Sequence, residues 1–126
     1  MVETQVIGFI PPMVGLDGEF NTFRLGQTLA KRLAAGDEVF LMNEKTKTVF
    51  GKAVVTSIET GLLGELCLIH AHKNHTEVGG DDPIRAPERL FKYIQKIYGP
   101  HIAEHGKKSV VLSLRRLDEP IGRSAD

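Results

Sequence analysis

Two apolar, β-branched stretches dominate the middle of the chain. Glu38–Met42 and Val49–Ile58 are rich in Val, Ile, Phe and Thr, which favour strands. The polar segment 43–47 between them is short enough to join antiparallel neighbours. Apolar residues occupy both odd and even positions of the two arms, and strands that are buried on both faces have this pattern. The sequence therefore predicts a long β-hairpin over Glu38–Glu59 that is covered on both faces.

The rest of the pattern predicts three helices and three shorter extended segments. Pro11 and Pro12 end the first strand, and Gly99 with Pro100 ends the last helix. The expected strands are Gln5–Ile10, a short piece Thr22–Arg24 and Lys108–Leu114, and the expected helices are Gly26–Ala34, Gly61–His72 and Glu88–Tyr98. For the second helix we expect a buried face made of Leu62, Leu63, Leu66, Ile69 and His70, which Cys67 can join.

This order of elements predicts a mixed α+β fold. The two longest strands are joined by a tight turn, which excludes a βαβ unit and favours a small curved sheet or a partly closed β-barrel with flanking helices. The chain of 126 residues suits one domain. We expect its core over about residues 17–117 and a flexible tail over 118–126.

Composition and charge narrow the function classes. Sixteen acidic and sixteen basic side chains cancel, which argues against a protein that coats nucleic acid nonspecifically. The single cysteine, Cys67, excludes an intrachain disulfide. No apolar run is long enough to cross a membrane, and Glu3 is unlike the basic start of a secretory signal. The expectation is a soluble, cytoplasmic protein without a membrane partner and of undetermined oligomeric state.

Several short motifs resemble the ASCH family, a PUA-like β-barrel group associated with RNA and modified nucleosides. They are Thr22-x-Arg24, the run Leu33–Val39 and the run Phe50–Thr56, followed by His70-Ala71 and the segment Tyr93–Tyr98. In particular the chain resembles the short bacterial ASCH proteins that hydrolyse N4-acetylcytidine. The resemblance covers about Asp17 to Leu117 and implies a small PUA-like barrel with a ligand cleft beside Asp17–Arg24.

The resemblance also implies a catalytic set that this chain carries only in part. The family signature Gly-x-Lys-x-x-Thr-x-Arg, aligned on Thr22 and Arg24, puts its lysine at Glu19. The family's catalytic glutamate falls on Asn74, and an amide cannot act as a general base. Thr22 remains, with Glu19 as an alternative base for its hydroxyl. Whether the protein is an enzyme therefore stays open.

Four further residues are candidates for ligand binding. Arg24 offers a planar donor fork for a phosphate or carboxylate, or else forms an internal salt bridge with Glu19 or Asp37. Lys52, Asn74 and the aromatic Phe23 complete the expected ligand-binding set, and Phe20 and Tyr93 are further candidates for stacking on a base.

A basic ridge is the second candidate surface. Four cations recur at helical spacing, which suits either a phosphate backbone or simply a solvated helix face: Arg85, Arg89, Lys92 and Lys96. The histidines His70, His72 and His75 lack the partners of a tetrahedral site, so no metal and no cofactor is expected.

The sequence supports three functional hypotheses. The first is an RNA- or modified-nucleoside-binding domain whose partner is RNA, a nucleoside or a nucleotide. The second is an amidohydrolase acting on N4-acylated cytidine with altered catalytic residues. The third is a regulatory module that binds another protein.

Overall fold

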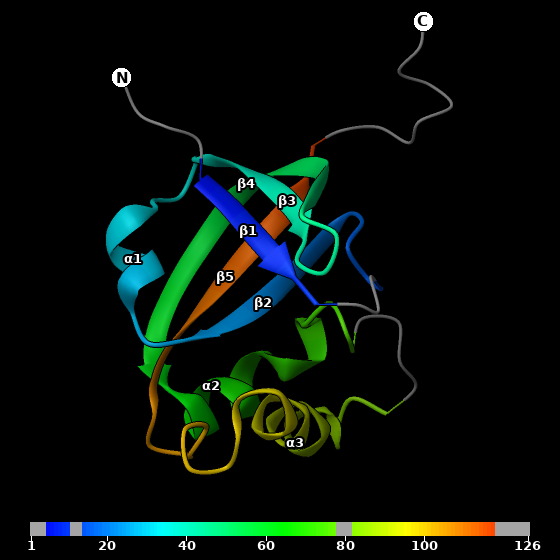
Figure 1. Ribbon diagram of the computed structural model, residues 1–126. Helices are drawn as coiled ribbons and strands as arrows, with labels where there is room; N and C mark the ends of the chain where they lie inside the picture. The colour runs from blue at the N-terminus through cyan, green and yellow to red at the C-terminus, as the bar shows by residue number, and fades with distance from the viewer. Residues whose placement is uncertain (1–4, 11–13, 78–81, 118–126) are drawn as a thin grey trace, which may run out of the picture.

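A curled, mixed five-stranded sheet forms a half barrel in the computed structural model, which describes residues 5–10, 14–77 and 82–117 (Figure 1). The strands lie in the order β1-β3-β4-β5-β2. Their bounds are β1 Gln5–Phe9, β2 Glu19–Leu25, β3 Glu38–Asn43, β4 Thr48–Leu62 and β5 Lys108–Arg116. The helices are α1 Thr28–Arg32, α2 Leu63–His70 and α3 Ala86–Tyr98, with a 3-10 turn over Ala71–Lys73 after α2. The prediction of a small α+β barrel-like fold is confirmed.

The predicted hairpin is the centre of this sheet. Strands β3 and β4 pair antiparallel, with Val39 opposite Ala53, and β4 continues to pair with β5 along the rest of its length. The turn between them contains Lys47 at φ 59°, a left-handed conformation that is uncommon for a residue other than glycine. β4 is the longest strand: its N-terminal part pairs with β3, and from Ala53 to Leu62 it pairs with β5.

Strands β1 and β2 are the two edges of the sheet. β1 pairs only with β3, in parallel, and β2 pairs with β5, antiparallel. Curling brings the two edges toward each other, and the Phe9 and Phe20 rings meet edge to face with centroids 6.2 Å apart. Within the described residues, no ladder of backbone hydrogen bonds joins β1 to β2. Side-chain contacts therefore close the gap between these two edge strands, which we call the barrel seam.

Two hydrophobic cores lie on opposite sides of β5. Val110, Leu112 and Leu114 face the inside of the barrel with the buried residues of the hairpin. Val111, on the other face, packs with Phe23 against the buried residues of α2 and α3. Successive side chains of β5 point to opposite faces of the sheet. One set fills the half barrel, and the other packs against the helices on its outside.

Burial corrects two sequence predictions. The hairpin is not covered on both faces: Val39, Leu41, Ala53 and Val55 are buried, whereas Val49 is exposed and Phe50 is half-buried. The strands that are covered on both faces are β5 and the middle of β2. In α2, Leu63, Leu66 and Cys67 are buried as expected, but Ile69 is exposed because the helix presents it to solvent.

Helix α3 is the best-predicted helix. Pro87 lies in its first turn, where a missing N–H costs nothing, and Gly99 ends it at φ 94°. Leu90 and Ile94 are buried. The predicted helix over Gly26–Ala34 is shorter in the structure, Thr28–Arg32, and the extended piece Thr22–Arg24 is part of a longer strand. Within the described part of the chain, no helix is both long and apolar enough to cross a bilayer.

Candidate functional site

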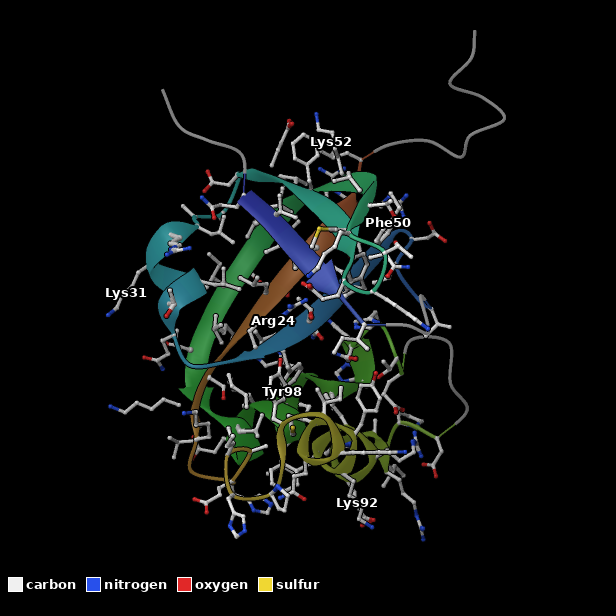
Figure 2. The ribbon with its side chains drawn as sticks, in the orientation of Figure 1. Arg24, Lys31, Phe50, Lys52, Lys92 and Tyr98 are labelled. Carbon is white, nitrogen blue, oxygen red and sulfur yellow. The ribbon has the colours of Figure 1, made fainter. Side chains whose placement is uncertain are left out.

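A small cavity of about 70 Å³ lies where the barrel seam meets helix α3. The end of β1 forms one wall, β2 forms the second and the side chains of α3 form the third. Its lining residues are Gly8, Phe9, Ile10, Thr22, Phe23, Arg24, Asn74, His75, Leu90, Tyr93, Ile94, Ile97 and Tyr98. Figure 2 shows Arg24 at the centre of the molecule, with Tyr98 below it. Four of the six residues predicted to form the site therefore lie together.

Arg24 is the cation of this cavity. Its side chain is half-buried, its Nε donates a 3.3 Å hydrogen bond to Thr22 Oγ1, and its guanidinium lies 5.0 Å from the Phe9 ring centroid. Neither Glu19 nor Asp37 forms an ion pair with it, and no other carboxylate in the described part of the chain does so. Arg24 therefore retains donors for a ligand.

Burial lowers the pKa of the Arg24 guanidinium from its ordinary value, while the nearby Tyr98 and Glu44 act in the opposite direction. Arginine stays protonated in proteins despite such shifts. The cavity consequently contains a permanent positive charge that is poorly solvated and therefore attracts an acceptor group.

Thr22 is buried beneath this cation. It lies two residues before Arg24, so the alternation of a strand puts both side chains on the barrel side of β2. Accepting the Arg24 hydrogen bond leaves the Thr22 hydroxyl proton available for another acceptor. The pair combines a fixed cation with a neutral hydroxyl donor.

His75 adds a neutral imidazole to the cavity, a position that the sequence did not predict for it. Its Nδ1 lies 3.1 Å from the Val14 carbonyl oxygen, which can only accept, so Nδ1 carries the proton. Burial lowers the pKa of His75 to about 4, with a smaller contribution from the Arg24 charge. At neutral pH the Nε2 atom is therefore unprotonated and can accept a hydrogen bond or a proton.

Asn74 lines the cavity, but its amide is used within the chain. Its Nδ2 donates to the Asn21 carbonyl at 3.3 Å, and its Oδ1 accepts from both the backbone N–H and the hydroxyl of Thr76. It also forms an isolated parallel bridge with Asn21. Asn74 thus fastens the segment after α2 to the free edge of β2, which shapes the cavity.

Two predicted site residues lie elsewhere. Glu19 is exposed at the start of β2, opposite Arg115 of β5, and strand alternation turns it away from the face that carries Thr22. Lys52 lies at the far end of the hairpin, where its Nζ is 3.1 Å from Glu38 Oε1 (Figure 2). Neither residue lines the cavity, so a Thr22–Glu19 pair has no geometric support.

The aromatic walls were partly predicted. Phe23 lines the cavity but is largely buried in the helical core, so little of its ring is available for stacking. Phe20 belongs to the barrel core. Tyr93 and Tyr98 come from α3, and Tyr98 is 41% exposed, which leaves its ring accessible from the mouth of the cavity. The position of Tyr98, four residues after Ile94, was the sequence signal for its place beside the cavity.

The basic ridge on α3 is interrupted by an internal contact. Arg89 donates to Glu77 through Nε at 3.2 Å and Nη2 at 2.7 Å, and to the Asp82 carbonyl at 2.7 Å. The hydrogen bonds to Glu77 raise the pKa of Arg89. Arg85, Lys92 and Lys96 are exposed. Arg89 thus anchors the segment before α3, and three cations remain on the solvent face.

The candidate metal ligands do not converge. His70 Nε2 lies 3.0 Å from Glu59 Oε2, His72 is exposed, and His75 lies in the cavity. Among the described residues, no three His, Cys, Asp or Glu side chains come together as a metal site.

A larger groove of about 880 Å³ lies between α2 and α3. Its lining is mostly apolar, with Leu68, Ile84 and Phe91, and its polar members are Glu65, Glu88, Lys92, Gln95 and His105. Specific ligand sites combine apolar walls with a few convergent polar groups. The groove has no buried cation and no counterpart of the Arg24–Thr22 pair. The smaller cavity is therefore the better candidate site.

Comparisons with known proteins support the fold. No family model and no curated protein sequence matches the chain significantly. The crystal structure of a hypothetical protein, PH0355, superposes with a TM-score of 0.64 at 15% identity, over 91% of this chain and 100% of that one. Protein EF3133 from Enterococcus faecalis V583, of the family DUF984, superposes with a TM-score of 0.55 at 12% identity, over 84% of this chain and 65% of that one. These similarities establish a shared barrel-like fold.

Proposed function

We propose that this protein is an ASCH-type domain that binds a nucleoside, free or within RNA, with a polar group of the base held by Arg24. The observation that carries the proposal is the half-buried Arg24 guanidinium, which has no carboxylate partner among the described residues and opens onto a cavity. An arginine in such a position binds acceptor atoms strongly, because little water competes with the ligand.

The size of the cavity supports recognition of a group rather than of a whole ligand. Its volume of about 70 Å³ is far below the roughly 300–1,000 Å³ of sites that enclose complete small molecules. A carbonyl, amide or carboxylate fits, whereas the rest of a nucleoside remains outside, against Tyr93 and Tyr98. Aromatic rings at the mouth suit the stacking by which proteins bind unpaired bases.

The test is a binding assay with the four common nucleosides, N4-acetylcytidine and short RNA oligomers, read by thermal stabilisation and by NMR. Arg24→Lys keeps the charge but removes the planar fork, and we expect a loss of affinity of about tenfold or more. Arg115→Lys is the matched control, since Arg115 is exposed on β5. Equal affinities of Arg24→Lys and the wild type would exclude the proposal.

A second candidate function is hydrolysis of an N4-acylated cytidine. The observation in its favour is the presence of a neutral His75 in the same cavity as the Thr22 hydroxyl. A threonine nucleophile needs a base, and His75 is the candidate because it lines the same cavity as Thr22, whereas Glu19 does not. Acetate release from N4-acetylcytidine, abolished in both Thr22→Ala and His75→Ala, would support this candidate. Absence of turnover at high protein concentration would eliminate it.

A further inference from the structure

The Phe9 ring is in contact with two polar side chains of the small cavity. The guanidinium carbon of Arg24 lies 5.0 Å from the centroid of this ring. The His75 imidazole meets the same ring edge to face, with the two centroids 5.1 Å apart. Arg24 belongs to β2 and His75 follows α2, and both line the cavity of about 70 Å³. Because so small a space holds only one chemical group, a group that enters it meets both side chains.

His75 offers its Nε2 atom as a hydrogen-bond acceptor. The contact of 3.1 Å with the Val14 carbonyl keeps the proton on Nδ1, and Val14 does not line the cavity, which leaves the Nε2 edge of the ring for it. Nε2 has no partner among the described residues and is not one of their buried unpaired polar atoms, so it is accessible. At neutral pH even an imidazole with the ordinary pKa of 6.5 is mostly unprotonated, so this acceptor does not depend on the lowered pKa of His75.

Arg24 and Thr22 supply donors to the same cavity. After the Arg24 Nε–H has bonded to Thr22 Oγ1, the remaining guanidinium N–H groups and the Thr22 hydroxyl proton are left for a ligand. The unpaired guanidinium nitrogens are accessible, since none is among the buried unpaired polar atoms of the described residues. A carbonyl oxygen has two lone pairs and can accept from both side chains, whereas an unprotonated ring nitrogen has only one. The donors therefore favour a carbonyl oxygen.

We propose that His75 is a specificity residue, which makes the cavity select a carbonyl group with an N–H directly beside it, as on the lactam edge of uracil or guanine. This inference rests on the proposed function and adds which edge of a base enters the cavity. The carbonyl accepts from Arg24 and Thr22, and the neighbouring N–H donates to His75 Nε2.

Other groups match this set of donors and acceptors less well. Cytosine has an unprotonated ring nitrogen beside its carbonyl, which would face the lone pair of His75 Nε2. Adenine has no carbonyl group. A phosphate or carboxylate bonds to Arg24 but has no hydrogen atom for His75 when it is ionised. Selection against these groups therefore comes from an acceptor that they leave unpaired.

The experiment compares two small ring compounds that differ in one group. γ-Butyrolactam has a carbonyl with an adjacent N–H, and γ-butyrolactone has an oxygen atom of similar size in place of the N–H. Their dissociation constants are measured at neutral pH by NMR titration of the wild type and of His75→Asn. The asparagine amide can still donate to the Val14 carbonyl but has no acceptor at the position of Nε2. We expect the wild type to bind the lactam about tenfold more tightly than the lactone, and His75→Asn to prefer it by about twofold or less.

His72→Asn is the matched control, because His72 is exposed and does not line the cavity, and it should keep the preference of the wild type. The nitrogen NMR resonance of His75 Nε2 gives a second measure that needs no variant, since a hydrogen bond from the lactam shifts it and the lactone has none to give. Equal affinities of the wild type for the two compounds, no binding of either, or an unchanged preference in His75→Asn would overturn the proposal.

The same compounds separate this proposal from the preceding one. If the wild type prefers the lactam through His75 but binds no nucleoside or RNA, the proposed function fails and the role of His75 stands. If nucleosides bind through Arg24 and the wild type does not distinguish lactam from lactone, only the specificity proposal fails. When both hold, uridine and guanosine should bind at least about fivefold more tightly than cytidine and adenosine, and the reverse order would contradict the role given to His75.

Discussion

The Arg24 Nε atom lies 3.3 Å from Thr22 Oγ1, on the same face of an edge strand. This hydrogen bond holds the guanidinium in one orientation. It uses one of the five N–H donors of Arg24 and leaves the other four for a ligand. It also explains how a Thr-x-Arg spacing brings the two side chains together: two residues is the shortest separation along a strand that returns to the same face.

Replacing Thr22 by valine should therefore weaken both binding and stability. Valine has nearly the same shape but no acceptor, so the Arg24 Nε–H loses its partner in a half-buried position. We expect a loss of about 1–2 kcal/mol in the free energy of unfolding, measured in urea, together with weaker nucleoside binding. Thr56→Val is the control, since its exposed hydroxyl donates to the Ser113 carbonyl outside the cavity. Similar effects of the two variants would contradict the role given to Thr22.

The His75 imidazole should make the protein less stable in acid. Its pKa in the folded state is lowered to about 4 from the ordinary 6.5, so between these values the unfolded chain binds a proton that the folded protein does not. Stability is then fully present above about pH 6.5 and falls as the pH drops toward 4, by roughly 2–3 kcal/mol. Urea unfolding of the wild type and His75→Asn at several pH values measures this term. The same decline in both proteins would show that other groups cause it.

Asn74 should prove to be a structural residue with an indirect effect on ligands. Its amide bonds to Asn21 and Thr76 while buried, so Asn74→Ala leaves several polar groups unpaired. We expect a loss of about 2–3 kcal/mol in the free energy of unfolding. Asn43→Ala is the matched control, because Asn43 makes comparable hydrogen bonds in an exposed turn. An Asn74→Ala protein of wild-type stability that has lost only ligand affinity would make Asn74 a direct ligand contact.

The cations of α3 make separable predictions for RNA. If RNA follows this helix, Lys92→Gln with Lys96→Gln should reduce the salt dependence of binding by about one unit of log–log slope per lost phosphate contact. Arg89→Gln should change it less, because Arg89 is bound to Glu77 and Asp82. Filter binding at several salt concentrations measures these slopes. A larger effect of Arg89→Gln than of the double variant would show that Arg89 leaves its internal contacts to bind RNA.

Much of the fold follows from local patterns in the sequence. The hairpin is marked by β-branched residues on either side of a polar turn, and α3 by Leu90 and Ile94 between Pro87 and Gly99. These patterns involve only residues that are close in the sequence, so they can be recognised without the tertiary structure. The Thr22–Arg24 pair belongs to the same class, since strand alternation alone puts both on one face.

Burial on either side of an element was decided by the tertiary structure. The hairpin is apolar at odd and even positions, yet only one face is fully buried, whereas β5 is covered on both. Ile69 has the hydrophobicity of a core residue but is exposed, because α2 docks through Leu63, Leu66 and Cys67. Hydrophobicity makes burial of a side chain favourable, but it does not determine which face of an element is buried. That depends on which other elements pack against it in the folded protein.

The composition of the site divides in the same way. Sequence alone predicted that Thr22 and Arg24 lie together, because their relation is local, and it pointed to Asn74 without revealing its hydrogen bonds. Only the tertiary structure showed that Glu19 and Lys52 lie away from the cavity and that His75 and Tyr98 line it. The residues that line the cavity come from segments far apart in the chain. They meet because the sheet curls until its two edge strands face each other next to α3. That long-range closure has no signature in any single stretch of sequence.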